Sequence, residues 1–253
     1  MKHAQSRGLS NGREYRLGGK QAYFHVMSHR FLKAAALVCS LSGCALIHRQ
    51  PAEPINTAAE IPSGTDEAFD SLMVDVQRVD STIVVDLRYA TPNNFTRAKL
   101  PGYEGNHAYL RAEASAALAV VQEDLRLQGL GLKVFDAYRP VRASEAMVAW
   151  TQTANRPDLL RDGYIAARSR HNLGVAIDLT LIDLNSKAEI SMGTPFDYFG
   201  VAAWTKNASG VIAKNRQLLK RVMERQGFVN YEKEWWHFSY PVANPLRFDK
   251  VIR

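Results

Sequence analysis

The segment EWWHFSY, residues 234–240, constrains the fold most strongly, because it holds two ionisable side chains inside an apolar stretch. Glu234 and His237 stand among two tryptophans, a phenylalanine and a tyrosine. An ionised carboxylate or an imidazole that is buried without a partner is strongly destabilising. Since residues three apart on a strand lie on opposite faces, these two can share a cleft only if Glu234 lies at the start of the strand or on a bulge. We therefore predict a final hairpin that borders a polar cleft, with Trp236 and Phe238 facing the core.

A second segment, HNLGVAIDLTL at residues 171–181, also places a charged side chain in an apolar strand. Its pattern predicts a turn at Gly174 and then a strand. On that strand Asp178 shares a face with Ala176 and Thr180, so one carboxylate lies alone among small or apolar neighbours. Such a residue either caps a neighbouring turn or belongs to a functional site.

The histidines after residue 70 are His107, His171 and His237, and the only two cysteines precede residue 45. A metal site in the folded domain must therefore use His, Asp or Glu. Two neutral imidazoles and one carboxylate, with a fourth position left to water, are typical of catalytic zinc. Glu234, offset from the strand, suits a general base that lies near a metal without binding it. A satisfied core histidine and a solvated hairpin carboxylate are the ordinary alternatives, and we interpret His107, in a glycine-flanked loop, as a surface residue.

Arg139, in the segment DAYRP, is a candidate for binding a developing negative charge. Pro140 favours an extended backbone at the residue before it, which would hold the guanidinium at the end of a strand. There its paired N–H donors could reach an oxyanion. The alternative is a structural ion pair with Asp136, and both interpretations stay open on these residues alone.

The rest of the chain alternates between strand and helix patterns. Strict alternation predicts a strand over residues 81–90, and helical spacing predicts two helices that end at Gly129 and Gly227. The other predicted elements are a strand at 132–139, a helix at 141–152 and the hairpin at 228–240. We expect a single α+β domain over residues 71–253, with a small, largely antiparallel sheet flanked by helices.

The basic character of the chain is concentrated at its N-terminus. The formal net charge is +7, but residues 1–43 contain seven basic residues against Glu14 alone, which leaves +1 for the rest of the chain. A nucleic-acid-binding domain would carry its positive charge on the folded part. We therefore expect no nucleic-acid partner and interpret residues 1–43 as a leader.

Residues 27–44, MSHRFLKAAALVCSLSGC, have a short basic segment, an apolar run and then small residues, which is the pattern of a secretory signal. The apolar run is too short to span a bilayer. Its end, LSGC, resembles the lipobox of bacterial lipoproteins, so we expect lipidation of Cys44 and export to the cell envelope or periplasm; an uncleaved anchor is the alternative. Met27 is a candidate for the true start. Residues 44–70, rich in proline, alanine and polar residues, are expected to form a flexible tether.

The segments YATPNNFT, DAYRP, SRHNLGVAIDLTL, MGTPFD and EWWHF, in this order, resemble the zinc D-alanyl-D-alanine dipeptidases. That group includes the vancomycin-resistance dipeptidases and lies within the wider hedgehog-like metallopeptidases. The resemblance extends from about residue 79 to the C-terminus, and SRHNLGVAIDLTL and EWWHF are its most specific parts. It implies the fold of that family and a hydrolytic activity that depends on one zinc ion per chain.

The resemblance also implies roles for individual residues. Zinc would be bound by His171, Asp178 and His237. Glu234 would be the catalytic base, and Arg139 would stabilise the transition state. The dipeptide pocket would be lined by Asp197, Tyr89 and Ser169.

The function implied by the resemblance is hydrolysis of D-alanyl-D-alanine to two D-alanines in the cell envelope. Asp197 would pair with the free ammonium group of the substrate, which distinguishes a dipeptidase from an enzyme that trims longer chains. One alternative is a D,D-carboxypeptidase or endopeptidase that acts on peptidoglycan stem peptides. Another is a non-catalytic lipoprotein that binds wall peptides. The expected partners are a small D,D-dipeptide and, through a lipid on Cys44, the membrane.

Overall fold

The computed structural model describes residues 60–253, so Cys44, the leader and most of the predicted tether lie outside the described residues. The α-helices in this range are α1 (Asp66–Leu72), α2 (Val76–Val79), α3 (Ala112–Arg126), α4 (Val141–Thr153), α5 (Asp158–Arg161) and α6 (Gly210–Arg225). The 3-10 helices are η1 (Arg88–Ala90), η2 (Arg170–Leu173) and η3 (Val201–Ala203). The strands are β1 (Met73–Asp75), β2 (Val84–Val85), β3 (Tyr109–Arg111), β4 (Leu130–Asp136), β5 (Ala176–Asp183), β6 (Val229–Asn230) and β7 (His237–Ser239).

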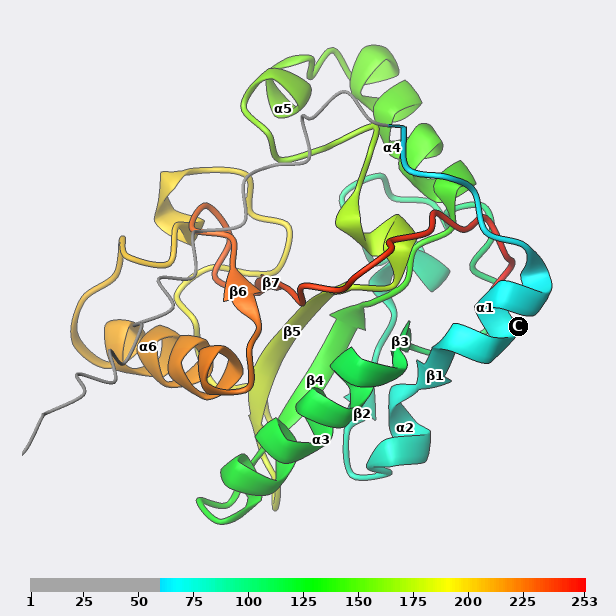
Figure 1. The fold of residues 1–253 in the computed structure, drawn as a ribbon. Helices are drawn as coiled ribbons and strands as arrows, with labels where there is room; N and C mark the ends of the chain where they lie inside the picture. The colour runs from blue at the N-terminus through cyan, green and yellow to red at the C-terminus, as the bar shows by residue number, and fades with distance from the viewer. Residues whose placement is uncertain (1–59) are drawn as a thin grey trace, which may run out of the picture. The chain divides into compact units, whose positions relative to one another are not determined.

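A five-stranded sheet in the order β2-β4-β5-β7-β6 lies at the centre of this domain (Figure 1). Its neighbouring strands run antiparallel, except that β2 is parallel to β4. β1 and β3 form a separate antiparallel pair. The long helix α3 packs against β4, α6 packs against β6, and the two helices contact each other (Figure 1). The prediction of an α+β domain with a small, largely antiparallel sheet is confirmed.

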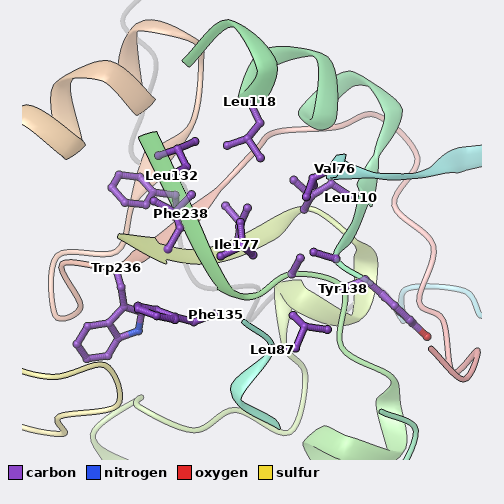
Figure 2. Close-up of a cluster of buried hydrophobic side chains, with 14 of the residues drawn as sticks. Val76, Leu87, Leu110, Leu118, Leu132, Phe135, Tyr138, Ile177, Trp236 and Phe238 are labelled. Atoms are coloured by element: carbon purple, nitrogen blue, oxygen red, sulfur yellow. The ribbon is translucent and has the colours of Figure 1, made fainter. Parts of the chain in front are cut away.

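One face of the sheet forms the core beneath α3. Ile177 of β5 and Phe238 of β7 are direct cross-strand partners, and both are fully buried. Leu118 of α3 points toward this pair, with Leu132 of β4 beside them (Figure 2). Burying a side chain of this size stabilises the fold by about 1.5–3 kcal/mol relative to leaving it exposed. Trp236, just before β7, is buried as well but also lines the cavity that contains Glu234 and His237, so the predicted core position is confirmed for Phe238 and only in part for Trp236.

The opposite face of the same strands carries a row of polar side chains. Asp136, Asp178 and His237 are direct neighbours across β4, β5 and β7. The first of these pairings depends on a β-bulge, because the register shifts after the pair Val134 and Leu179. The bulge leaves one residue of β4 unpaired and so brings the next carboxylate into the row. Strand pairing thus sets the positions of three chemically active side chains.

The folded chain begins earlier than the predicted domain boundary. α1 starts at Asp66 and is capped by Thr65, whose Oγ1 accepts a backbone hydrogen bond of 3.2 Å. Before it, Gly64 N donates to Arg247 O at 2.8 Å, which ties this segment to the C-terminal part of the chain. The helix has 7 residues and buries only Phe69, too few for an apolar period to be visible in the sequence. The last part of the predicted tether therefore belongs to the domain.

The strand predicted over residues 81–90 is shorter than expected. β2 contains two residues, and the chain then turns into η1. The side chain of Asn106 forms hydrogen bonds with backbone groups at the end of this strand. Its Nδ2 donates to Val85 O (3.1 Å), and its Oδ1 accepts from Leu87 N (3.0 Å). Tyr89 consequently lies on a 3-10 turn rather than on a strand.

The helices follow the predicted pattern more closely. α3 lies inside the predicted segment 110–129, and α4 extends one residue beyond the predicted segment 141–152. α6 ends shortly before Gly227, as predicted. In the described residues we find no helix that combines the length and the apolar character needed to cross a membrane.

Candidate metal centre and active site

The three predicted metal ligands converge on one point. His171 comes from η2, Asp178 from β5 and His237 from β7. One donor atom from each lies within 4.8 Å of the others. His171 Nε2 is 3.2 Å from His237 Nδ1 and 3.5 Å from Asp178 Oδ2, while His237 Nδ1 is 2.9 Å from Asp178 Oδ1.

These separations fit a four-coordinate metal. Zinc bonds of about 2.0–2.1 Å at tetrahedral angles place neighbouring donor atoms about 3.3 Å apart. The observed separations of 2.9, 3.2 and 3.5 Å bracket that value. Two imidazole nitrogens and a carboxylate oxygen also form a donor set that suits zinc chemically. The group can therefore hold a metal ion.

Hydrogen bonds fix the orientation of His171. Its Nδ1 lies 2.6 Å from Ala137 O, and since a carbonyl can only accept, Nδ1 carries the proton and the lone pair of Nε2 faces the other ligands. Ser169 Oγ accepts from His171 N at 3.2 Å and caps η2. Asn172 Nδ2 donates to Arg139 O at 2.9 Å, which ties η2 to the segment that follows β4.

The charge states of the ligands favour metal binding. Burial would raise the pKa of Asp178, but the charges and hydrogen bonds of His171 and His237 hold that pKa well below its usual value. Burial lowers the pKa of His237, against the opposing effect of the Asp178 carboxylate. An ionised carboxylate and a neutral imidazole are the forms that bind metals.

Glu234 lies beside the ligands in the turn before β7. Its Oε2 is 3.9 Å from His237 Nδ1. Asn230 holds the turn, because its Nδ2 donates to Glu234 O at 3.1 Å and to His237 O at 3.0 Å. Burial, and then the charges of Asp178 and Asp197, raise the pKa of Glu234 well above its usual range. Glu234 thus occupies the predicted position at the start of the strand and is a stronger proton acceptor than an exposed glutamate.

Arg139 makes the ion pair that was one of its two alternatives, and it also faces the site. Its Nε and Nη2 donate to Asp136 Oδ2 at 3.0 and 2.8 Å. Asp136 is fully buried and also accepts from Tyr103 OH at 2.6 Å. The Arg139 guanidinium lies 5.1 Å from the centre of the Tyr89 ring, and its Nη2 is 3.9 Å from Asp178 Oδ2. The ion pair therefore holds the guanidinium toward the ligands, and the two alternatives are compatible.

A cavity of about 810 Å³ brings the predicted residues together. Residues 160–171 line one part of its wall, and residues of the last hairpin between 229 and 239 line another. Every predicted site residue in the described part of the chain lines this cavity: Tyr89, Arg139, Ser169, His171, Asp178, Asp197, Glu234 and His237.

Asp197 is the residue of this set with a strained backbone. It lies in the loop between β5 and α6 with φ 60°, a left-handed conformation that aspartate tolerates better than most residues. Tyr89 OH lies 3.1 and 3.2 Å from its two carboxylate oxygens and donates to them. Burial and the nearby charge of Asp178 raise the pKa of Asp197 well above its usual range. A cationic ligand group would relieve this unfavourable environment.

Three supporting residues were not identified from the sequence. Asn172, Asn230 and Tyr103 are buried polar side chains that hold η2, the Glu234 turn and Asp136. The sequence shows only that the asparagines are close to candidate residues and that the tyrosine lies in a glycine-rich loop. Such arrangements are too common to identify a supporting residue. His107 is half-exposed, its Nδ1 is 2.8 Å from Asp75 Oδ2, and it is not among the residues that line the cavity.

An α+β domain that presents a His-Asp-His group, a neighbouring glutamate and a buried arginine in one cavity has the construction of a metallopeptidase. The sequence matches the D-Ala-D-Ala dipeptidase family over residues 70–251, and the chain belongs to this family of metallopeptidases.

The curated relatives carry the same description. The D-alanyl-D-alanine dipeptidase of Enterococcus faecium is 34% identical over 169 residues, covering 60% of this chain and 83% of that protein. The D-alanyl-D-alanine dipeptidase of Escherichia coli is 34% identical over 173 residues, covering 68% of this chain and 86% of that protein.

Solved structures give weaker matches. The vancomycin-resistance D,D-dipeptidase VanXYg, in complex with a D-Ala-D-Ala phosphinate analogue, is 18% identical with a TM-score of 0.35, covering 67% of this chain and 66% of that chain. The D,D-pentapeptidase VanY, in complex with Zn(II), is 16% identical with a TM-score of 0.34, covering 63% and 87%. Family membership therefore rests on the sequence matches.

Proposed function

We propose that the protein hydrolyses D-alanyl-D-alanine to two D-alanines, with one zinc ion held by His171, Asp178 and His237. The observation that carries the proposal is the group of three donor atoms separated by 2.9–3.5 Å, with the Glu234 carboxylate 3.9 Å from His237 Nδ1. The names of the relatives, all D-alanyl-D-alanine dipeptidases, support the choice of substrate.

The zinc ion would polarise the scissile carbonyl and lower the pKa of water to about 7. Glu234 accepts a proton from the attacking water and donates it to the leaving amine, for which its raised pKa is suited. Arg139, held by Asp136 toward the ligands, donates hydrogen bonds to the developing oxyanion. Both residues act from fixed positions in the cavity wall.

Asp197 binds the free ammonium group of the dipeptide. Tyr89 orients its carboxylate through one hydroxyl proton shared between the two oxygens, and the substrate cation offsets the unfavourable burial of the negative charge. Ser169 Oγ already accepts from His171 N, which leaves its hydroxyl proton to donate to the substrate. The amino-terminal side of the pocket is then closed to a longer peptide chain by charge recognition.

A D,D-carboxypeptidase acting on wall stem peptides is the second candidate. The observation in its favour is the cavity volume of about 810 Å³, which lies toward the upper end of the range for small-molecule sites and exceeds the needs of a two-residue peptide. The carboxypeptidase would use the same catalytic residues. The two functions differ in whether Asp197 requires a free ammonium group.

Incubation of the purified protein with D-Ala-D-Ala and with a wall pentapeptide, each with and without a chelator, tests the proposed function. We expect chelator-sensitive release of D-alanine from the dipeptide. Chelator-sensitive release from the pentapeptide alone would replace the dipeptidase by the carboxypeptidase. Binding of either peptide without any hydrolysis would identify a non-catalytic binding protein.

The role of Asp197 is tested by blocking the ammonium group. N-acetylated D-Ala-D-Ala and the pentapeptide should each be cut at least about thirtyfold less efficiently than the free dipeptide, because an unpaired buried carboxylate costs about 2–5 kcal/mol. Asp197→Ala should narrow this gap by harming the free dipeptide most. Equal kcat/KM for the free dipeptide and the pentapeptide in the wild type would contradict this role.

For the location, we propose export and attachment to the envelope membrane through a lipid on Cys44. The basic segment, apolar run and LSGC sequence of residues 27–44 support this, and they lie outside the described residues. Cys44→Ser should convert a membrane-associated protein into a soluble or uncleaved form on cell fractionation. A wild-type protein already in the soluble fraction would rule out the lipid anchor.

A further inference from the structure

The loop that carries Asp197 is held by a buried side chain of α6. We call residues 191–207 the Asp197 loop; they lie between β5 and α6. Arg216 of α6 is 2% exposed. Its guanidinium donates to four carbonyl oxygens of this loop, those of Met192 (2.8 Å), Ala202 (2.9 Å), Trp204 (2.8 Å) and Asn207 (3.5 Å). These carbonyls lie on both sides of Asp197, so Arg216 holds the two ends of the segment that bears it.

An arginine at this buried position needs a specific reason. Burial alone lowers the pKa of the Arg216 guanidinium, with no contribution from a carboxylate in the described residues. A buried charge without a counter-ion is unfavourable, and an apolar residue next to Leu219 and Met223 would avoid that penalty. The advantage of arginine is its planar fork of donors, which reaches several acceptors at once. Here those acceptors belong to an irregular segment in which the carbonyls have no strand partner.

The same contacts extend to the turn that carries Glu234. Trp235, the residue after Glu234, donates from its backbone N to Ala203 O at 3.1 Å. Two of the carbonyls that Arg216 binds are those immediately before and after Ala203 in the chain. The guanidinium therefore holds the short segment on which the Glu234 turn rests.

We propose that Arg216 is a positioning residue for both site carboxylates: it sets Asp197 at the substrate ammonium group and Glu234 at the scissile bond. The metal ligands do not depend on it, because strand pairing and η2 hold them. The roles of the two carboxylates rest on the proposed function. The control of the loop by Arg216 does not, and it can be measured without catalysis.

The test compares Arg216→Lys with Leu219→Ala in the full-length protein. Lysine keeps the charge, but its donors lie on a single nitrogen and cannot span these separated carbonyls as the guanidinium does, whereas Leu219→Ala weakens the packing of the same helix and leaves the guanidinium in place. Both variants should melt at a lower temperature. Only Arg216→Lys should lower kcat for D-Ala-D-Ala, by about 10-fold to 100-fold, and raise KM, since small displacements of reacting groups have effects of this size.

Amide hydrogen exchange supplies a readout that does not depend on activity. In Arg216→Lys the amides of residues 203–205 and of Trp235 should exchange at least about tenfold faster, while the amides of β5 keep the wild-type rate. In Leu219→Ala any increase in the exchange rate should extend beyond these amides. Metal content should match the wild type in both variants.

The outcomes are decisive in both directions. Wild-type exchange in the Asp197 loop of Arg216→Lys, or equal kinetic losses in the two variants, would overturn the proposal. If Arg216→Lys does not fold, Arg216→Met, which fills the same space without a charge, takes its place with the same expectations; if neither folds, Arg216 is only a structural residue. If Arg216→Lys shows the faster exchange but the wild-type protein does not hydrolyse D-Ala-D-Ala, the control of the Asp197 loop by Arg216 is supported and the dipeptidase function is rejected instead.

Discussion

The three proposed metal ligands, His171, Asp178 and His237, are held by η2, β5 and β7, whereas Asp197 and Glu234 lie in loops. Asp178 and His237 are register partners on β5 and β7, and the neighbouring pair in the same register packs into the core. Asp197 has a left-handed backbone in a long loop, and Glu234 lies in a turn. A shift of the strand register would bury the ligands in the core and expose the core residues. The ligand geometry is therefore coupled to the stability of the whole domain.

The two regions also differ in how they hold negative charge. The two histidines keep the pKa of Asp178 low against the effect of burial, so its ionised form is favoured in the folded protein. Burial raises the pKa of Asp197 and of Glu234, so ionisation of either is unfavourable until a partner arrives. In the sheet region the carboxylate is therefore favoured in its ionised form by its own neighbours, whereas in the loop region ionisation becomes favourable only with a further partner.

The largest effects on activity are expected from substitutions of Asp178, a proposed metal ligand, and Glu234, the proposed base, and metal content should distinguish the two. Asp178→Ala should lose tightly bound metal and fall to the activity of the chelated protein, because the proposed site has three protein ligands and none to spare. Glu234→Gln should keep the metal and lose about 10²–10⁴-fold in kcat, the usual contribution of a general base. Metal analysis and kinetics on the same preparations check both. Full metal content in Asp178→Ala, or metal loss in Glu234→Gln, would reverse the assignment of the two regions.

An intermediate effect is expected at the residue that joins the two regions. Arg139→Lys should keep the metal but lose about 10²-fold or more in kcat, because a single ammonium cannot replace the guanidinium that pairs with Asp136 and faces the site. Single-turnover kinetics at saturating dipeptide isolate this step. Arg142→Lys, on an exposed ion pair with Asp249, is the matched control and should be near wild type. Equal behaviour of the two variants would return Arg139 to a purely structural role.

The smallest expected effect concerns stability and pH in the chelated protein. The raised pKa of Asp197 means that the folded state binds this proton more tightly than the unfolded state does. Its contribution to stability is therefore complete below about pH 4, the unfolded pKa, and is lost as pH rises through the folded pKa. Asp197→Asn should gain stability relative to the wild type as pH rises, by about 1.4 kcal/mol per unit of pKa shift.

Asp178→Asn should change folding stability in the opposite direction from Asp197→Asn. The lowered pKa of Asp178 stabilises the folded state above about pH 4, and this contribution is lost as pH falls through the folded pKa. The variant should be less stable than the wild type at neutral pH, and the gap should close in acid. Urea unfolding of Asp197→Asn at about pH 4 and pH 7.5, and of Asp178→Asn at about pH 7.5 and at several pH values well below about pH 4, checks the pair. The same sign of change in both would remove the electrostatic difference between the regions.

Elements and residues with local signals could be predicted from the sequence. Periodicity and glycine stops located α3, α4 and α6, because a helix repeats its apolar face within a few residues. Isolated ionisable residues in apolar strands marked Asp178, Glu234 and His237, since burial makes such residues improbable without a use. The resemblance to a known family added Asp197, Tyr89 and Ser169, which no local pattern distinguishes.

Which side chains meet depends on contacts between residues that are distant in the sequence. A bulge in β4 places Asp136 opposite Asp178, and a one-residue difference in strand register would have separated them. The short α1 and the early end of β2 depend on contacts with Arg247 and Asn106, which are distant in sequence. The carbonyls bound by Arg216 likewise could not be predicted from the sequence. A residue that acts through the backbone of a remote loop leaves no pattern in its own neighbourhood, because its partners are backbone atoms that every residue type possesses.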